Sequence, residues 1–196
     1  MTLNTSTFSL AGKKGLILGV ANESSIAWGC TQLMHQLGAE LVVSCLNDKA
    51  RRFVEPLTQP IGVELVTCNV EEEGERVSSV QRAIARMVQL YFVIHSISWA
   101  PLSDLHGNVI DSSSDGFSRA MAVSCHSFAR LAKLCAPHMP NGGSMLSMTY
   151  LGADEAVPHY GLMGPVKAAL ESLTRYMAME LGEQGIRVHA VSPGPI

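Results

Sequence analysis

Residues 15–29 read GLILGVANESSIAWG and join an apolar run of strand length to the beginning of a helix. The run at 15–20 contains no polar side chain, which is typical of a strand that is buried on both faces of a sheet. From Ile26, apolar residues recur at helical spacing as far as Leu37, and Gly38 then ends the helix. This pair of elements begins an alternation of strands and helices that runs through the chain.

The alternation continues to the C-terminus of the sequence. Further apolar runs predict strands at residues 41–45, 63–66, 91–97, 145–149 and 187–191. Amphipathic stretches predict helices at residues 48–58, 74–88, 112–134 and 166–181, with Asp48 as the cap of the first. The pattern predicts an α/β fold, a doubly wound parallel sheet of the Rossmann-like type in three layers. Residues 1–196 are expected to form a single domain that binds its ligands at the carboxyl ends of the strands.

The composition fits one compact domain with a hydrophobic core. The chain has 196 residues, of which 47% are hydrophobic, and a formal net charge of −3, which excludes disordered and fibrous classes. The sequence has no run of Lys or Arg, which argues against a nucleic-acid partner. No apolar run is long enough to cross a bilayer, and the first ten residues lack the layout of a signal peptide. We therefore expect a cytoplasmic protein without a membrane partner.

The cysteines give no sign of a metal site. They are an odd number, and no two of them have the Cys-x-x-Cys spacing of a zinc ligand pair. We expect no metal and interpret the cysteines as ordinary buried thiols in a reducing cytosol. They are Cys30, Cys45, Cys68, Cys125 and Cys135.

The turn after the first strand suits the pyrophosphate of a dinucleotide, although it lacks the G-x-G-x-x-G fingerprint. Gly19 lets the chain leave the strand tightly. The helix that begins at Ile26 presents free N–H groups and the positive end of its dipole. Ser25 can add its hydroxyl to the phosphate contacts. The alternative is that Ser24 or Ser25 only caps the helix.

The end of the second strand is where many NAD enzymes hold the ribose hydroxyls with a carboxylate. Leu46 follows this strand, and no carboxylate stands at its tip. An enzyme that uses NADPH needs a basic group there. Lys49 and Arg51 come a few residues later and are expected to face solvent. The sequence therefore favours NADH over NADPH.

Tyr160 and Lys167 lie seven residues apart within the stretch 149–167, TYLGADEAVPHYGLMGPVK. Seven residues of a helix turn through about 700°, so both side chains project from one face if this segment is helical. A lysine near a tyrosine helps the tyrosine hydroxyl to act as an acid or a hydrogen-bond donor. Tyr150 lies seventeen residues before the lysine. The alternative is that both tyrosines are ordinary aromatic residues of the core or its rim.

These motifs together resemble the bacterial enoyl-acyl-carrier-protein reductases, a divergent branch of the short-chain dehydrogenase family. The resemblance runs from Leu10 to Ile196. It rests on Ser-Ile-Ala at 25–27, Asn-Asp-Lys at 47–49, His-Ser-Ile at 95–97, Tyr-Leu-Gly-Ala at 150–153, the Tyr-x6-Lys segment and Ser-Pro-Gly-Pro-Ile at 192–196. Most short-chain dehydrogenases carry a tyrosine four residues before the lysine and a serine seventeen before it. Here these positions hold Met163 and Tyr150, which is the arrangement of the enoyl reductase branch.

The resemblance implies the reduction of a trans-2-enoyl thioester on acyl carrier protein with NADH, the last step of the fatty acid elongation cycle. Reduced nicotinamide gives a hydride to the β carbon, and Tyr160 donates a hydrogen bond to the thioester oxygen as negative charge builds on it. Lys167 holds the nicotinamide ribose. Tyr150 shapes the substrate side of the site, which Ala100 also borders.

A set of cofactor contacts is also implied by the resemblance. They are Gly19, Ser25, Ile26, Leu46, Asn69, Val70, Ser96, Ile97, Lys167, Pro195 and Ile196. Asn69 stands where the family usually carries an Asp beside the adenine, and Ser98 stands where it commonly carries a Gly. We interpret the neighbouring His95 as a half-buried strand residue that hydrogen-bonds to the backbone.

The resemblance implies a homotetramer built on the helices at 112–134 and 166–181, which carry more apolar surface than one face of a sheet needs. The candidates for the interface are Met121, Leu131, Met177 and Met179. The alternative is that these four residues belong to the core.

Family members continue beyond Ile196 with a threonine region at the nicotinamide, a helix that covers the acyl chain and a last strand, which this sequence lacks. Without them we expect an open pocket and an exposed apolar edge at the sixth strand. Two alternatives to the enoyl reductase stay open. One is a non-catalytic NAD-binding paralogue or subunit partner, and the other is a 3-oxoacyl-thioester reductase of the same fold.

Overall fold

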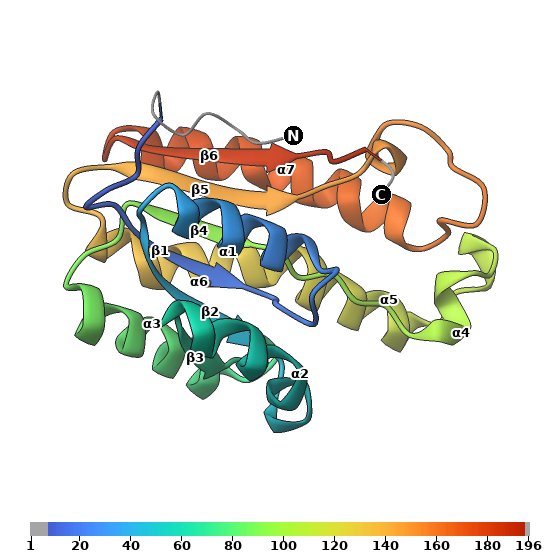
Figure 1. Ribbon diagram of the computed structural model, residues 1–196. Coiled ribbons are helices and arrows are strands. Elements are labelled where there is room, and N and C mark those ends of the chain that lie inside the picture. Colours follow the sequence, from blue (N-terminus) through green and yellow to red (C-terminus); the bar gives the residue numbers. More distant parts are fainter. Residues whose placement is uncertain (1–7, 195–196) are drawn as a thin grey trace.

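The computed structural model describes residues 8–194, which form a parallel sheet between two layers of helices (Figure 1). The strands are β1 Lys14–Leu18, β2 Glu40–Cys45, β3 Glu64–Thr67, β4 Phe92–His95, β5 Gly143–Met148 and β6 Ile186–Val191. Their order is β3-β2-β1-β4-β5-β6, and all neighbours are parallel. This is the strand order of a doubly wound Rossmann-like sheet, so the predicted fold class is confirmed.

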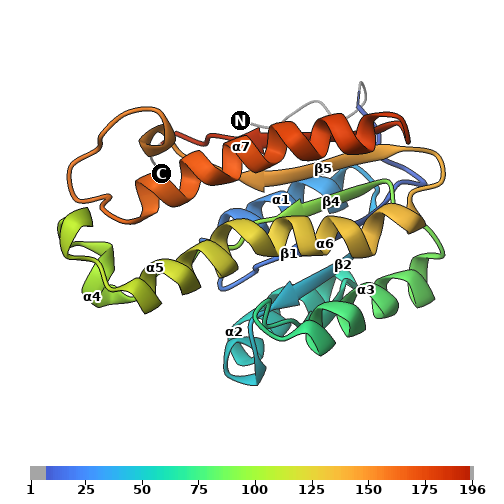
Figure 2. The same ribbon diagram turned by 180° about the vertical axis from the view of Figure 1, so that it is seen from behind.

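Helices cover both faces of the sheet. They are α1 Ile26–Gln36, α2 Asp48–Thr58, α3 Glu73–Met87, α4 Leu102–Leu105, α5 Ser114–Met121, α6 Ser127–Cys135 and α7 Met163–Gly182. Single turns of 3₁₀ helix occur at η1 Gln59–Ile61, η2 Val109–Asp111, η4 Ala136–His138 and η5 Leu151–Ala153. Seen from behind, α3, α6 and α7 lie in front of the sheet, whereas α1 lies on its other face (Figure 2).

Each face of the sheet has its own core, because side chains of a strand alternate between the two faces. Leu16 and Leu18 of β1 belong to the larger cluster, which also contains Phe128 of α6 and Leu170 of α7. Ile17, between the two leucines, belongs to the smaller cluster under α1 and α2. The apolar run of β1 therefore supports both helical layers, as expected for a central parallel strand.

The helix predicted at 112–134 has an interruption that the sequence pattern did not indicate. Ser113 caps α5 by accepting a hydrogen bond from the N–H of Gly116. After α5 the chain forms a π-helical segment, η3 Ala122–His126, and then continues as α6. A π segment adds a residue to a turn and often marks a functional region. Apolar spacing alone cannot distinguish it from a regular helix.

The cap of α2 is Asn47, so the prediction of Asp48 is wrong. The side-chain oxygen of Asn47 accepts a hydrogen bond from the N–H of Ala50 at 3.0 Å. Asn47 has an extended backbone, whereas Asp48 already has helical geometry. A cap must lie outside the helix for its side chain to reach back to the first turn.

Helix α7 begins at Met163, earlier than predicted, so that Gly164 and Pro165 lie in its first turn. Proline fits there because the first N–H groups of a helix have no acceptor within it. Tyr160 nevertheless lies before the helix. The condition under which Tyr160 and Lys167 would project from one helical face is therefore not met.

Two of the four residues proposed for a subunit interface belong to the core. Leu131 is 1% exposed and Met177 is 5% exposed. Met121 is partly buried against the larger core cluster, and Met179 is 69% exposed. Of these residues, Met179 is the one that α7 presents on the surface.

Four of the five cysteines are buried, and Cys30 is partly buried. In the part of the chain that the structure describes, no group of three or more His, Cys, Asp or Glu could hold a metal ion. No helix among the described residues is long and apolar enough to cross a membrane.

Candidate active site

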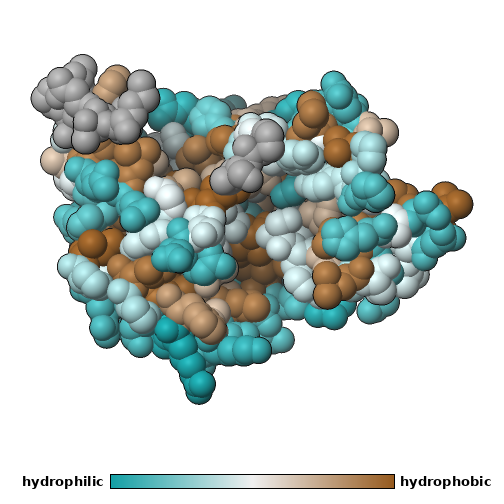
Figure 3. Space-filling view, turned by 45° about the vertical axis from the view of Figure 1, so that its right-hand side comes forward, coloured by the Kyte–Doolittle hydropathy of each residue, from teal (hydrophilic) through white to brown (hydrophobic). Residues whose placement is uncertain are grey.

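The face of the molecule at which the parallel strands end is hollowed, with apolar side chains in the hollow (Figure 3). A cavity of about 530 Å³ lies at the carboxyl ends of β1, β2, β3 and β4, and we call it the strand-end cavity. Its lining includes six of the predicted cofactor residues. They are Gly19, Leu46, Asn69, Val70, Ser96 and Ile97.

Gly19 is required by the geometry at the mouth of β1. Its φ of +100° is disfavoured for any residue with a side chain. A Cβ atom at this position would lie 2.1 Å from the carbonyl oxygen of Ser96, which follows β4. The glycine therefore lets the residue after β1 contact the residue after β4, and this contact forms one wall of the strand-end cavity.

The N-terminus of α1 is open to an anion. Ser25 occupies the cap position, but its side chain makes no capping hydrogen bond, so the interpretation of Ser25 as a simple cap is wrong. The Ser25 hydroxyl instead donates to the carbonyl of Asn22 at 2.7 Å. The N–H of Trp28 donates to the carbonyl of Ser25, and the N–H of Ile26 lies before it at the positive end of the helix dipole. Neither Ser25 nor Ile26 lines the strand-end cavity, so this helix end adjoins it.

No basic side chain of β2 or α2 lines the strand-end cavity. Lys49 is exposed, as predicted. Arg51 is not fully exposed, which corrects the expectation that it faces solvent. Its guanidinium donates to the carbonyl of Leu65 at 3.2 Å and to Glu55 at 3.3 Å. These contacts engage the Arg51 guanidinium within the protein, and Arg51 does not line the strand-end cavity.

His95, the last residue of β4, is a fully buried structural residue. Its Nε2 lies 2.7 Å from the hydroxyl of Ser127 and its Nδ1 lies 3.4 Å from that of Ser147. Burial, with the charge of Lys167, lowers its pKa to about 3. The prediction of a half-buried residue bonded to backbone was therefore wrong in its exposure and in its partners. A neutral imidazole between two hydroxyls explains why this histidine tolerates burial.

The strand-end cavity contains charged residues that the sequence analysis missed. Glu71 and Glu75 line it from the segment after β3, and Arg119 lines it from α5. The Arg119 guanidinium lies 4.5 Å from the centre of the Trp99 ring and donates two hydrogen bonds of 3.1 Å to Glu71. Nothing near Arg119 in the sequence indicates this role. Glu75 could have been found from the sequence, because it lies in the first turn of the helix that follows β3, where side chains can reach the strand ends.

Lys167 is buried at the end of β5. It is 3% exposed, and its Nζ donates a hydrogen bond of 2.6 Å to the carbonyl of Met148. Burial lowers its pKa to about 8, because an ammonium group loses hydration there. The lysine therefore carries its charge at neutral pH and loses it just above.

Tyr150 and Tyr160 lie against each other in the segment between β5 and α7. Their ring centres are 4.6 Å apart and the rings are tilted by 48°. Burial, and then the neighbouring Tyr150, raises the pKa of Tyr160 to about 12. Tyr160 therefore keeps its proton and remains a hydrogen-bond donor at neutral pH. We call Tyr150, Tyr160 and Lys167 the reaction corner.

The backbone that carries Tyr160 is a strained turn. His159 has a φ of +64° and Gly161 a φ of +49°, on either side of the tyrosine. A non-glycine residue in this region costs about 1–2 kcal/mol. A Cβ at Gly161 would also lie 2.7 Å from the carbonyl oxygen of Leu105, so the turn is fixed by the segment around α4. Strain of this kind is common where a side chain has a functional orientation.

Helix α7 holds the end of β5 at two successive residues. Lys167 binds the carbonyl of Met148, and Glu171, one turn later, accepts a hydrogen bond of 2.6 Å from the hydroxyl of Thr149. The next residue is Tyr150. These two hydrogen bonds therefore fix the backbone directly before Tyr150, the first tyrosine of the reaction corner.

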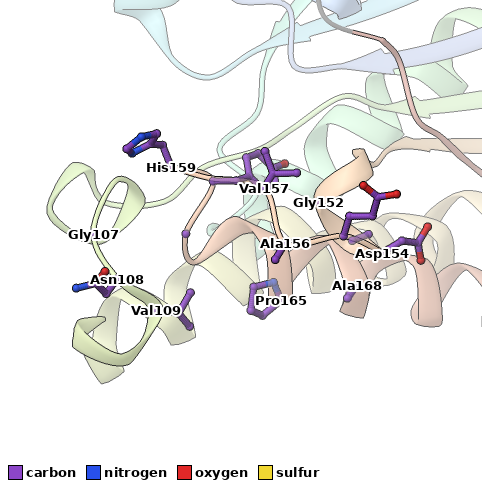
Figure 4. A pocket seen from close by; sticks show the side chains of 15 residues that line it. Gly107, Asn108, Val109, Gly152, Asp154, Ala156, Val157, His159, Pro165 and Ala168 are labelled. Carbon is purple, nitrogen blue, oxygen red and sulfur yellow. The ribbon is translucent and has the colours of Figure 1, made fainter.

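A second pocket, of about 480 Å³, lies over the outer side of α7's first turns (Figure 4). Pro165 and Ala168 of α7 line it, with the loop after η5 on one side and the turn at Gly107 on another. Tyr160 lines this pocket and also packs against the larger core cluster. Lys167 does not line it. Ala100, predicted on the substrate side, is 9% exposed and belongs to the core cluster.

The strand-end cavity and the reaction corner together are typical of a dinucleotide-dependent enzyme. A doubly wound sheet with an open helix end and a cavity at the strand ends suits an extended dinucleotide. A protonated tyrosine and a buried lysine at the next strand suit stabilisation of negative charge on an oxygen atom. The predicted cofactor residues Pro195 and Ile196 lie outside the described residues.

Comparison with known proteins identifies the family. The family model described as enoyl-(acyl carrier protein) reductase matches residues 19–196. The chain is 40% identical over 186 residues to enoyl-acyl-carrier-protein reductase 1 (NADH) of Rhizobium meliloti, which covers 94% of this chain and 68% of that protein. It is 42% identical over 191 residues to the NADH enoyl-acyl-carrier-protein reductase FabI of Synechocystis sp., which covers 95% and 74%.

A solved structure agrees with these relatives. The enoyl-acyl-carrier-protein reductase of Anaplasma phagocytophilum, solved in complex with NAD, matches with a TM-score of 0.93 and 38% identity, over 96% of this chain and 72% of that one. The chain belongs to the enoyl-acyl-carrier-protein reductase family.

Proposed function

We propose that this chain reduces the carbon–carbon double bond of a trans-2-enoyl thioester on acyl carrier protein with NADH, the last step of the fatty acid elongation cycle. The observation that carries the proposal is the reaction corner, in which Tyr160 keeps its proton against Tyr150, and Lys167 is buried at the end of β5. Membership in the enoyl-acyl-carrier-protein reductase family supports it.

The cofactor side of the proposal fits the described residues. NADH, when bound, supplies the hydride. The open end of α1 and the strand-end cavity offer an anion site next to space for an adenosine. The lack of a basic side chain at the tip of β2 supports NADH over NADPH. Within the cavity we assign the cofactor to Gly19, Leu46, Asn69, Val70, Ser96 and Ile97, with Ser25 and Ile26 at the helix end and Lys167 at the nicotinamide ribose.

Each residue of the reaction corner has a separate task. Tyr160 donates its O–H to the thioester oxygen and stabilises the negative charge that develops there in the transition state. Lys167 keeps a positive field at the end of β5 and orients the ribose. Tyr150, whose ring lies tilted against that of Tyr160, limits the position of the acyl chain, and Ala100 borders the same side.

The missing serine–tyrosine pair supports reduction of an alkene over reduction of a ketone. A ketone reductase must deliver a proton to an alkoxide oxygen, whereas the enolate takes its proton from solvent at the α carbon and its oxygen needs only a stabilising donor. Met163 stands four residues before Lys167 and is buried in the core at 3% exposure, so it offers no proton there.

The assembly and the location are also part of the proposal, and membership in the family suggests them. We propose a homotetramer formed by α5, α6 and α7 in the cytoplasm, with residues 1–196 as one dinucleotide-binding reductase domain. Two side chains of α7 support an interface, because Tyr176 is 62% exposed and Met179 is 69% exposed.

A substrate comparison tests the reaction type. NADH oxidation is followed with crotonyl and acetoacetyl thioesters, both as coenzyme A and as acyl-carrier-protein derivatives. We expect turnover with the crotonyl thioesters and none with the acetoacetyl thioesters. Turnover with acetoacetyl thioesters alone would show a 3-oxoacyl reductase, and NADH binding without any turnover would show a non-catalytic paralogue.

A further inference from the structure

The fold fixes which end of a bound dinucleotide meets the strand-end cavity. The reaction corner lies at β5 and α7, so the nicotinamide belongs there. The pyrophosphate belongs at the open end of α1, in the middle of the sheet. The adenosine must then extend the other way, toward β2 and β3. The strand-end cavity, lined by Leu46 after β2 and by Asn69 after β3, receives it.

Most polar groups on this side of the cavity are already occupied within the protein. The side-chain oxygen of Asn69 accepts a hydrogen bond from the N–H of Glu71 at 3.1 Å. Both carboxylate oxygens of Glu71 are bound by Arg119. The side-chain oxygen of Asn47 caps α2.

Glu75 keeps one carboxylate oxygen available as a hydrogen-bond acceptor. It lies in the first turn of α3 and lines the strand-end cavity, and its side chain is half-buried. Its Oε2 accepts a hydrogen bond from the backbone N–H of Asn69 at 2.7 Å. No hydrogen bond from a described residue reaches its Oε1. The negative charge of Glu75 also acts on Cys68, another lining residue, and helps to raise the pKa of that thiol after burial has raised it.

We infer that Glu75 is the residue that recognises the base of the dinucleotide, by accepting a hydrogen bond from the 6-amino group of adenine. An ionised carboxylate only accepts hydrogen bonds, so it pairs with an amino group and repels a 6-oxo group. Asn69 suits this task less well, because its oxygen already serves the turn and its free amide group is a donor. The inference rests on the proposed function, which supplies the dinucleotide.

Direct binding tests the inference without turnover. NADH and reduced nicotinamide hypoxanthine dinucleotide, which carries a 6-oxo group, are titrated by fluorescence and by calorimetry. A hydrogen bond to a charged group predicts that the wild-type chain prefers NADH by at least about tenfold. In Glu75→Gln, the one side-chain oxygen stays with the Asn69 N–H and the amide N–H₂ faces the base, so we expect this preference to fall to about one or to reverse.

The variants separate base recognition from folding. Glu75→Gln keeps an oxygen for the Asn69 N–H, and its melting temperature should stay close to that of the wild type. Glu72→Gln removes the same charge from an exposed residue at the cap of α3 and should keep the wild-type preference.

Three results would overturn the inference. Equal binding of both dinucleotides to the wild type excludes a recognising carboxylate while leaving the proposed function intact. A preference that survives Glu75→Gln and disappears in Asn69→Ala assigns the task to Asn69. Failure of the wild type to bind either dinucleotide, with the fold intact, removes the proposed function and the inference with it.

Discussion

The strand-end cavity and the reaction corner are built in different ways. The cavity lies at the carboxyl ends of β1, β2, β3 and β4 and is completed by side chains of α2, α3 and α5, so its position is set by the ends of the sheet. The reaction corner combines Tyr150 after β5, Tyr160 in a strained turn and Lys167 inside α7. The first region depends on regular elements, and the second depends on long-range contacts that hold an irregular loop.

This difference separates binding from chemistry. Changes in the reaction corner should alter turnover and leave the affinity for NADH nearly unchanged, except at Lys167, which we assign to both. Changes at the strand ends should alter affinity or stability. Each of the following experiments asks whether the two regions can be perturbed separately.

Removal of the Tyr160 hydroxyl should have the strongest effect. Tyr160→Phe deletes the donor for the developing charge and should lower kcat by about 10²–10³-fold, the loss typical of one such donor. Its Kd for NADH should not change, because the strand-end cavity is untouched. Steady-state kinetics and a fluorescence titration measure the two quantities.

The matched control is the neighbouring ring. Tyr150→Phe removes a hydroxyl at the same place but not the assigned donor, so its kcat should fall much less than that of Tyr160→Phe. An equal loss in both variants would mean that the two tyrosines act as one unit and that the assignment to Tyr160 alone is wrong.

Replacement of the buried lysine should affect both regions. Lys167→Met removes the ammonium group that we place at the cofactor ribose, and the loss of a charged hydrogen bond should weaken NADH binding by about 10–100-fold. Calorimetry measures the change. Lys133→Met, an exposed lysine of α6, serves as the control and should bind like the wild type. Unchanged affinity in Lys167→Met would confine the lysine to a structural role.

A methyl group at Gly19, at the carboxyl end of β1, should destabilise the wall of the strand-end cavity. Gly19→Ala places a Cβ against the carbonyl oxygen of Ser96 and strains a positive φ, so we expect a loss of about 1–3 kcal/mol in the free energy of unfolding. Gly29→Ala, in α1 with open space around it, should instead gain about 0.5–1 kcal/mol. Urea denaturation compares the pair, and a similar change in both would refute the steric account.

The titration of Lys167 should give the mildest effect. Its pKa is about 8 in the folded chain, below the ordinary value of 10.5. Between these values the unfolded chain binds more protons, so stability should rise with pH through this window. The kcat/KM should fall over the same range as the positive charge is lost. Denaturation and kinetics across this pH range test both trends, and Lys167→Met should abolish the rise in stability.

Local sequence signals were sufficient for the fold but not for the whole site. Apolar runs and helical spacing located the six strands and indicated a parallel doubly wound sheet, because each strand and helix is specified by its own residues. The π segment at Ala122–His126 leaves the apolar spacing almost unchanged, so the pattern could not reveal it. Arg119 reaches the cavity from α5, far from Glu71 in the sequence, and no local pattern predicts that contact.

The spacing of Tyr160 and Lys167 shows a subtler difference. Tyr160 lies in the turn before α7 and Lys167 lies within α7, so the helical reason for pairing them does not apply. The turn at Tyr160 depends on Gly161 fitting against the carbonyl oxygen of Leu105. Such a contact between distant segments is invisible to periodicity.

Isotope transfer decides whether this chain is an enoyl reductase. NADH carrying deuterium at its transferable position is incubated with crotonyl-acyl-carrier-protein, and the product is analysed by NMR and mass spectrometry. We predict a saturated butyryl thioester with deuterium on the β carbon. An unlabelled, unreduced crotonyl thioester in the presence of bound NADH would contradict the account.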